Sequence, residues 1–107
     1  MAFVYLLGDS GQDNCFKIGI TRGKIEKRIK QLQTGNAEEI FLVNYYETNY
    51  PFLLERLLHM KFFPKQKRNE WFIMDIENVN KFKEYCFKFE QTAKSLVDNP
   101  FSNKFLK

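Results

Sequence analysis

The chain has 107 residues, 44% hydrophobic and 17% aromatic, which is enough apolar surface for one domain that folds without disulfides or bound metals. Its 17 Lys and Arg against 13 Asp and Glu give a formal charge of +4, which permits nucleic-acid binding without establishing it. There is no basic signal segment, and no apolar run approaches the ~20 residues of a membrane span. We therefore expect an intracellular protein, cytoplasmic or nuclear, with no membrane partner.

The first two apolar runs, residues 2–8 and 15–21, are rich in β-branched and aromatic side chains. Residues 9–14 between them are all turn formers, so the sequence predicts an antiparallel hairpin. In this hairpin we expect Tyr5 and Lys17 to face each other. Gly19 and Gly23 at the end of the second run allow a sharp turn and close approach to a ligand. A polar site at this end of the hairpin is the expected result.

Residues 24–33 carry apolar side chains at helical spacing, and residues 34–36 supply a stop, so a short amphipathic helix is predicted. Arg28 lies beside the apolar stripe of this helix and is the cation placed to lean into a cleft. The alternative is that its aliphatic stem covers the edge of the core while the guanidinium stays in water.

Residues 39–47 form a third strand, whose continuous apolar character favours a central position in the sheet. Pro51 then opens a helix that runs to about residue 62. Glu55 and His59 lie one turn apart along one border of its apolar stripe, where a half-buried carboxylate belongs. His59 is either a hydrogen-bonded structural residue or an acid–base group, and its ordinary pKa near ~6.5 leaves both roles open.

The last third of the chain begins with a basic loop, residues 64–69, and a short strand or extended segment at the sheet edge, residues 70–74. Residues 77–97 have the apolar spacing of one long amphipathic helix that packs on the sheet. Cys15 and Cys86 lie in apolar stretches without Cys or His at metal-ligand spacing, so both are interpreted as reduced core thiols.

These elements predict an α/β fold of the α+β kind, a small antiparallel sheet of three to four strands flanked by three helices. Residues 1–97 form a single domain in this interpretation. Residues 98–107 form a C-terminal tail, whose Phe101 and Phe105 are candidates to pack on the domain.

Two tripeptides in the hairpin, Phe3-Val4-Tyr5 and Lys17-Ile18-Gly19, resemble the paired tripeptides of the GIY-YIG nuclease superfamily. Arg28 and Glu55 stand where that superfamily carries its arginine and its metal-binding glutamate. Residues 17–21, 28–36 and 70–72 are similar to a compact branch of the superfamily found in phages, large DNA viruses and some cellular proteins. The resemblance covers about residues 2–74 and implies a GIY-YIG-like fold and a viral or phage-like source.

The resemblance also implies an activity, which is metal-dependent hydrolysis of DNA phosphodiester bonds, most simply nicking. In this hypothesis Tyr5 accepts a proton from the attacking water, and Arg28 clamps the scissile phosphate. Glu55 binds one Mg²⁺ or Mn²⁺, which a single carboxylate can hold together with waters and phosphate oxygens. His59 beside Glu55 is included as a further catalytic candidate.

The sequence departs from the superfamily pattern at three places. Lys17 stands where most members have tyrosine, so it either binds phosphate or lowers the pKa of Tyr5. Phe3 replaces a glycine, which we expect to be harmless because the tyrosine carries the chemistry. Asn69 and Asn78 are both candidates for the downstream asparagine of the superfamily.

The expected partner is double-stranded or branched DNA. Residues near the Tyr5/Lys17 cleft that would contact it share small size or positive charge: Gly19, Thr21, Arg22, Lys24, Lys27, Lys30, Lys65, Lys67 and Arg68. The alternative function is a catalytically weak or inactive DNA-binding module with the same fold. A weaker alternative is a protein-interaction domain whose basic residues are only solvated. Tyr5, Arg28 and Glu55 together favour the enzyme, because a binding module needs no carboxylate facing phosphate.

Overall fold

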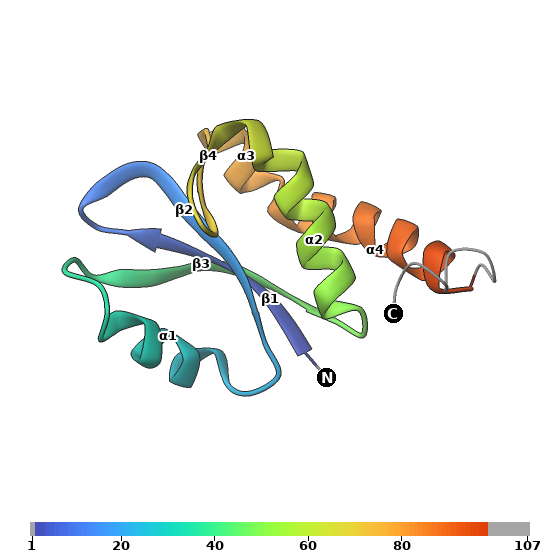
Figure 1. Ribbon diagram of the computed structural model, residues 1–107, viewed down its shortest axis with the longest axis horizontal. Helices are drawn as coiled ribbons and strands as arrows, with labels where there is room; N and C mark the ends of the chain where they lie inside the picture. The colour runs from blue at the N-terminus through green and yellow to red at the C-terminus, as the bar shows by residue number, and fades with distance from the viewer. Residues whose placement is uncertain (1, 99–107) are drawn as a thin grey trace.

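The computed structural model describes residues 2–98. In chain order the elements are β1 (Ala2–Asp9), β2 (Gln12–Thr21), α1 (Ile25–Gln33), β3 (Ile40–Thr48), α2 (Pro51–Phe62), the 3₁₀ helix η1 (Phe63–Lys65), β4 (Gln66–Arg68), β5 (Trp71–Ile73), α3 (Ile76–Asn80) and α4 (Phe82–Asp98). The strands form one antiparallel sheet in the order β3-β1-β2-β5-β4 (Figure 1). The predicted fold class is confirmed, with five strands and four α-helices within residues 2–98. Apart from Asp98, the predicted tail lies outside the described residues.

The sheet lies between two helical layers, with α1 on one face and α2 and α4 on the other (Figure 1). Val4 and Leu6 of β1 point into the larger core, which α2 and α4 complete. Tyr5 and Leu7 point into the smaller core beneath α1. Strand β1 is buried along nearly its whole length because it has a partner strand on each side and helices on both faces.

The predicted hairpin is present, but its turn is shorter than the six turn-forming residues indicate. The strands extend through Asp9 and from Gln12, and an Asp9 carboxylate oxygen accepts the Gly11 N–H at 2.8 Å. Tyr5 pairs with Gly19 in the resulting register, so the expectation that it faces Lys17 is wrong. Lys17 still shares a face with Tyr5, because the register differs from the expected one by two residues and side chains alternate with a period of two.

Strand β3 lies at the edge of the sheet, so the prediction of a central position is wrong. Its apolar character has another cause, which is packing against α4 on one face. The Glu90 carboxylate of α4 accepts hydrogen bonds from the hydroxyls of Tyr46 (3.0 Å) and Thr48 (2.6 Å). Burial and the Glu90 carboxylate raise the pKa of Tyr46 to about 12. Part of the apolar character, at Val43 and Tyr46, therefore reflects contact with a helix, whereas Phe41, Leu42 and Tyr45 are exposed.

Two predictions about the last third of the chain need correction. The predicted basic loop, residues 64–69, contains part of η1 and the short strand β4. The predicted single helix, residues 77–97, is interrupted at Lys81 and divided into α3 and α4. Both corrections concern short elements. Such elements are too short to leave a hydrophobic periodicity in the sequence from which they could be predicted.

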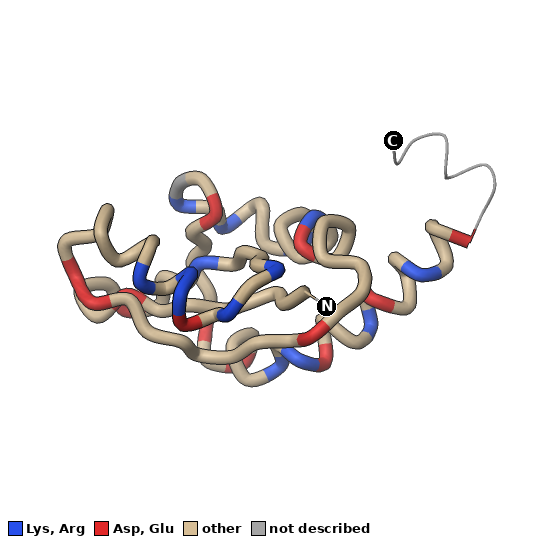
Figure 2. The backbone as a smooth tube through the Cα atoms, turned by 90° about the horizontal axis from the view of Figure 1, so that it is seen from below, with Lys and Arg blue, Asp and Glu red and all other residues tan. Residues whose placement is uncertain are grey.

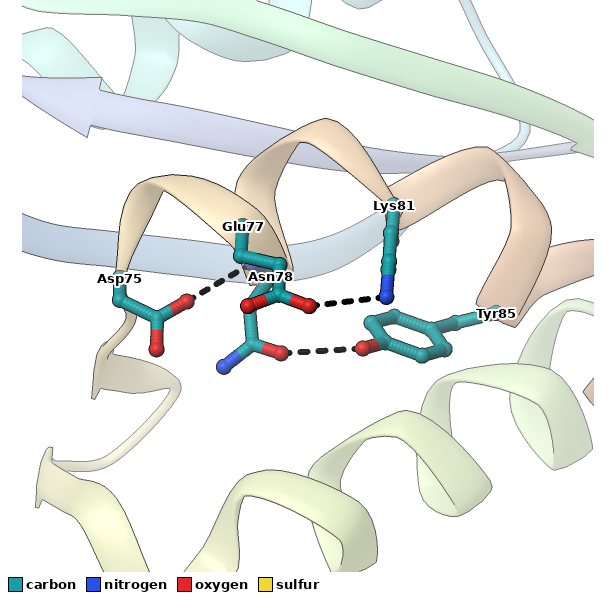
Figure 3. Close-up of polar contacts among 5 residues, drawn as sticks. All are labelled: Asp75, Glu77, Asn78, Lys81 and Tyr85. Atoms are coloured by element: carbon teal, nitrogen blue, oxygen red, sulfur yellow. Dashed lines mark hydrogen bonds and ion pairs between the residues drawn. The ribbon is translucent and has the colours of Figure 1, made fainter.

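A set of polar contacts surrounds the interruption between α3 and α4 (Figure 3). The Asp75 carboxylate caps α3 by accepting the Asn78 N–H at 2.8 Å, and Lys81 forms an ion pair with Glu77 at 2.9 Å. The Tyr85 hydroxyl donates to the Asn78 side-chain oxygen at 3.0 Å. The buried apolar residues continue at helical spacing across the break, and for that reason the sequence pattern did not show it.

The two cysteines are buried, as predicted for core thiols. Burial raises the pKa of the Cys86 thiol to about 12, with a smaller contribution from Glu90. Cys86 therefore stays protonated at neutral pH, and its contribution is to packing.

Candidate active site

Tyr5 occupies the face of the hairpin beneath α1, and its ring lies across strand β2 at Gly19. The tyrosine is 1% exposed. A Cβ atom at Gly19 would lie 2.6 Å from Cζ and 2.7 Å from Cε1 of the Tyr5 ring, far inside van der Waals contact. Glycine is therefore required at position 19 because the phenol passes directly over the backbone. Because Tyr5 is buried here, Gly19 has a packing role. The sequence indicated a different role for Gly19, which is to allow a ligand to approach the backbone.

We expect Gly19→Ala to destabilise the protein by about 1–3 kcal/mol, the usual cost of forcing an extra methyl group into a packed site. Urea denaturation measures the change. Gly23→Ala is the matched control, because a Cβ there meets only Thr21 Oγ1 at 3.9 Å. Equal stability of the two variants would contradict the placement of the Tyr5 ring.

The hydroxyl end of Tyr5 approaches a stretch of β2 that lacks a strand neighbour on one side within the described chain. Strand β5 pairs only with residues 15–17 of β2. Beyond these residues, His59 of α2 supplies the next contact to the β2 backbone, with its Nε2 atom 2.8 Å from the Ile18 carbonyl oxygen. The centre of the His59 ring lies 5.0 Å from that of Phe72. A carbonyl only accepts, so Nε2 carries the proton. This contact is the hydrogen-bonded structural role that the sequence left open for His59.

Glu55 lies one turn before His59 on α2 and is half-buried. Burial raises the pKa of its carboxyl group, the charge of Glu70 raises it further, and His59 and Lys17 lower it. Within the described residues its carboxylate makes no hydrogen bond or ion pair to another side chain. A carboxylate in this state is available to a cation.

Glu70, which immediately precedes β5, is a charged residue of this site that sequence reasoning did not select. Its carboxylate forms an ion pair with Lys17 at 2.9 Å, and the Lys17 side chain is only 12% exposed. The Lys17 ammonium also lies 5.7 Å from the centre of the Trp71 ring. Lys17 is therefore held by Glu70 and Trp71. In the sequence, the signal for Glu70 is the phrase formed by residues 70–72, which carries the resemblance but indicates no chemistry for the carboxylate.

Arg28 of α1 interacts with the Tyr5 hydroxyl. That it leans into a cleft stays a prediction. The pKa of Tyr5 is raised above its ordinary value because burial outweighs the lowering effect of Arg28 through hydrogen bonding and charge. Glu70 and Glu55 raise it slightly further. An Arg28 amino group also donates to Gln31 Oε1 at 3.3 Å, which holds the guanidinium in this position. One phenol, one guanidinium and two carboxylates thus interact electrostatically at the edge of β2.

The structure places the two asparagine candidates differently. Asn69 lies in the turn between β4 and β5 and lines a polar pocket of about 340 Å³ together with Lys17 and Trp71. Asn78 lies in α3 and bonds the Tyr85 hydroxyl. Asn69 is the candidate beside Lys17.

The structure gives the exposure of most of the predicted DNA-contacting residues, and their contact with DNA stays a prediction. Arg22 lines a groove of about 900 Å³ together with Glu55 and His59. The other residues of the set are not among those that line this groove. Gly19 is buried, Thr21 is partly exposed, and Lys24, Lys27, Lys30, Lys65 and Lys67 are exposed. Arg68 belongs to β4. Figure 2 shows Lys and Arg on several separate segments of the chain, with Asp and Glu on others.

A divalent cation would find one free carboxylate here. In residues 2–98 no group of three or more His, Cys, Asp or Glu side chains is arranged to hold a metal. Mg²⁺ commonly takes one or two carboxylates and completes an octahedron with waters and substrate phosphates. The Glu55 carboxylate fits this pattern, whereas a structural zinc site would need more protein ligands.

The fold is that of a small α+β domain with an antiparallel sheet. The family model of the T5orf172 domain matches residues 2–99, and the chain belongs to this family. The family is phage-associated and is linked to nuclease-like and DNA-binding functions, which suggests interaction with DNA. Neither a curated protein nor a solved structure gives a significant match. Among the helices within residues 2–98, none combines the length and apolar character that a membrane span requires.

Proposed function

We propose that this chain is a metal-dependent DNA endonuclease of the GIY-YIG type that hydrolyses phosphodiester bonds, one strand at a time. The supporting observation is the convergence of Tyr5, Arg28 and Glu55. They come from β1, α1 and α2, and both Arg28 and Glu55 act on the pKa of the Tyr5 hydroxyl. A binding surface has no need to bury a phenol beside a half-buried, unpaired carboxylate, because both groups cost stability.

Each side chain has a distinct role in the proposed reaction. In its phenolate form Tyr5 takes the proton of the attacking water, and the planar Arg28 guanidinium binds the scissile phosphate through two donors. Glu55 holds Mg²⁺ or Mn²⁺, which when bound supplies a Lewis acid for the phosphate oxygens. Glu70 holds Lys17 near these groups, and a phosphate that competes for the Lys17 ammonium would replace this ion pair. His59 supports the edge of β2 through the Ile18 carbonyl.

A second candidate function is a DNA-binding module without turnover. Two observations favour it, namely the raised pKa of Tyr5 and the ion pair that neutralises Lys17. Both keep the Tyr5 hydroxyl protonated at neutral pH, so that little phenolate is present to accept a proton. A nicking assay on supercoiled plasmid with Mg²⁺ or Mn²⁺ separates the two functions. Metal-dependent relaxation by the wild type, lost in Glu55→Gln, supports the enzyme, and equal behaviour of the two proteins supports the module.

Arg28→Ala should lower the nicking rate by about 10²–10³, the typical loss when one preorganised donor to the transition state is removed. Lys27→Ala on the same helix is the control, because Lys27 is exposed and outside the cluster. The two rates are compared on the same plasmid at one ionic strength. A similar loss in both variants would indicate that only general positive charge matters.

Binding to duplex DNA should weaken steeply with salt, since the exposed Lys and Arg side chains release counterions when they contact phosphates. Fluorescence anisotropy with two unrelated duplexes at about 50 and 200 mM salt measures the slope. Similar slopes on both duplexes are expected, because phosphate contacts carry no sequence information. Binding that does not change with salt would argue against phosphate contacts.

A further inference from the structure

Helix α2 presents apolar side chains on two opposite faces, and within residues 2–98 only one of these faces is covered. On the inner face Leu54 and Leu58 are fully buried in the main core. On the outer face Phe52 and Met60 are each 65% exposed, and Phe63 of η1 is 67% exposed. An apolar face of a helix is usually buried against another element. The outer strip, defined as Phe52, Met60 and Phe63, therefore has the composition of a binding surface.

The outer strip lines the same groove of about 900 Å³ that contains Glu55 and His59. Two cations, Arg22 and Arg56, line the groove as well. The Arg22 guanidinium carbon lies 5.5 Å from the centre of the Phe52 ring, within the range of a cation–π contact. The groove thus combines aromatic faces with guanidinium groups and is continuous with the candidate active site.

We propose that the outer strip binds unpaired nucleotides of a DNA strand, with bases stacked on Phe52 and Phe63 and phosphates met by Arg22 and Arg56. Aromatic platforms interleaved with cations are the general means by which proteins hold single strands, because every base has a π-face and every linkage a negative charge. The proposal rests on the proposed function, since it makes DNA with unpaired bases, such as gapped or branched DNA, the preferred substrate of the Glu55 site.

The positive charge of the groove favours DNA over two other possible occupants, which are the C-terminal segment and a second copy of the chain. Residues 99–107 follow soon after Val97, which lines the groove, but this segment contains Lys104 and Lys107 and no acidic residue. It would bring positive charge to Arg22 and Arg56. A second copy of the chain packed strip to strip would likewise bring arginines against arginines. A DNA strand is the occupant whose charge complements the groove.

The test uses a duplex with a short single-stranded gap containing 2-aminopurine, a base whose fluorescence falls on stacking, and the same duplex without the gap. Binding is measured in EDTA, so that cleavage does not interfere. The wild type should quench the probe and bind the gapped DNA about tenfold more tightly than the intact duplex, since stacking strengthens binding by a factor of roughly 5 to 150 per base. Phe52→Ala and Phe63→Ala should each weaken gapped binding at least about fivefold and reduce the quenching.

Phe87→Ala is the matched control, because Phe87 is 61% exposed on α4 and does not line the groove. It should retain wild-type quenching and affinity. Equal binding of the two DNAs by the wild type, or equal losses in Phe52→Ala and Phe87→Ala, would overturn the proposal even if plasmid nicking succeeds. Quenching of the probe without any plasmid nicking would support nucleotide binding by the outer strip and would reject the proposed endonuclease function.

Two further measurements test whether the C-terminal segment or a second copy of the chain occupies the groove instead of DNA. If a chain that ends at Asp98 quenches the probe and the full chain does not, the terminal segment fills the groove and the proposal fails. If Phe52→Ala converts a dimer to a monomer in sedimentation without changing DNA binding, a second copy fills it and the proposal fails.

Discussion

Replacing Glu55 by glutamine should abolish metal-dependent nicking while DNA binding stays equal to or tighter than that of the wild type. The amide keeps the size of the side chain but removes the charge that a hard cation requires. The same change removes a repulsion between the carboxylate and phosphate, so affinity for DNA should not fall. The measurement is plasmid nicking in Mg²⁺ and Mn²⁺ alongside anisotropy in EDTA.

The same variant should also be more stable than the wild type at neutral pH. The pKa of Glu55 is raised in the folded protein, so the folded state binds its proton more tightly than the unfolded state does. Stability therefore falls as pH rises from the ordinary carboxyl pKa through the raised pKa of Glu55, and at pH 7 the ionised group is a net cost. Glutamine removes this cost. Denaturation at pH 7 and at low pH should show that the advantage of the variant is greater at pH 7.

Glu84→Gln is the control for both effects, because Glu84 is exposed on α4, away from the cluster. It should change neither nicking nor the pH dependence of stability. If Glu55→Gln retained metal-dependent nicking, Glu55 would not be a ligand of the metal. A loss of stability in Glu55→Gln would show that the carboxylate has a structural partner.

Tyr5→Phe should lower the nicking rate by about 10²–10⁴, the usual contribution of a general base. The ring still packs over Gly19, and only the hydroxyl near Arg28 is lost. Stability should therefore change by less than about 1 kcal/mol, the net value of a typical hydrogen bond. The rate is measured by plasmid nicking and the stability by urea denaturation.

The pH profile distinguishes a base from a packing residue. Because burial raises the pKa of Tyr5, the phenolate fraction at neutral pH is small. It grows roughly tenfold per pH unit below the pKa, so the wild-type rate should rise with this slope between about pH 7 and 9. Tyr5→Phe should lose the slope, whereas the control Tyr45→Phe, which alters an exposed tyrosine of β3, should keep it. An unchanged slope in Tyr5→Phe would assign the proton transfer to another group.

Local patterns in the sequence were sufficient to predict the helices and strands that carry the proposed catalytic residues. The hydrophobic period located α1 and α2, and it put Arg28 and Glu55 at the borders of their apolar stripes. Turn formers between two β-rich runs located the hairpin that holds Tyr5. These features depend on neighbours in the chain, and for that reason a single sequence contains them.

The arrangement of those elements depended on contacts between distant residues. The pairing of Tyr5 with Gly19, the edge position of β3 and the ion pair between Lys17 and Glu70 each join segments far apart in the chain. Hydrophobic patterns specify which face of a strand is buried, but not which strand lies beside it, nor which of several charges meet at its end. Only the tertiary structure brought Glu70 to Lys17 and made burial, not a neighbouring cation, the dominant influence on the pKa of Tyr5.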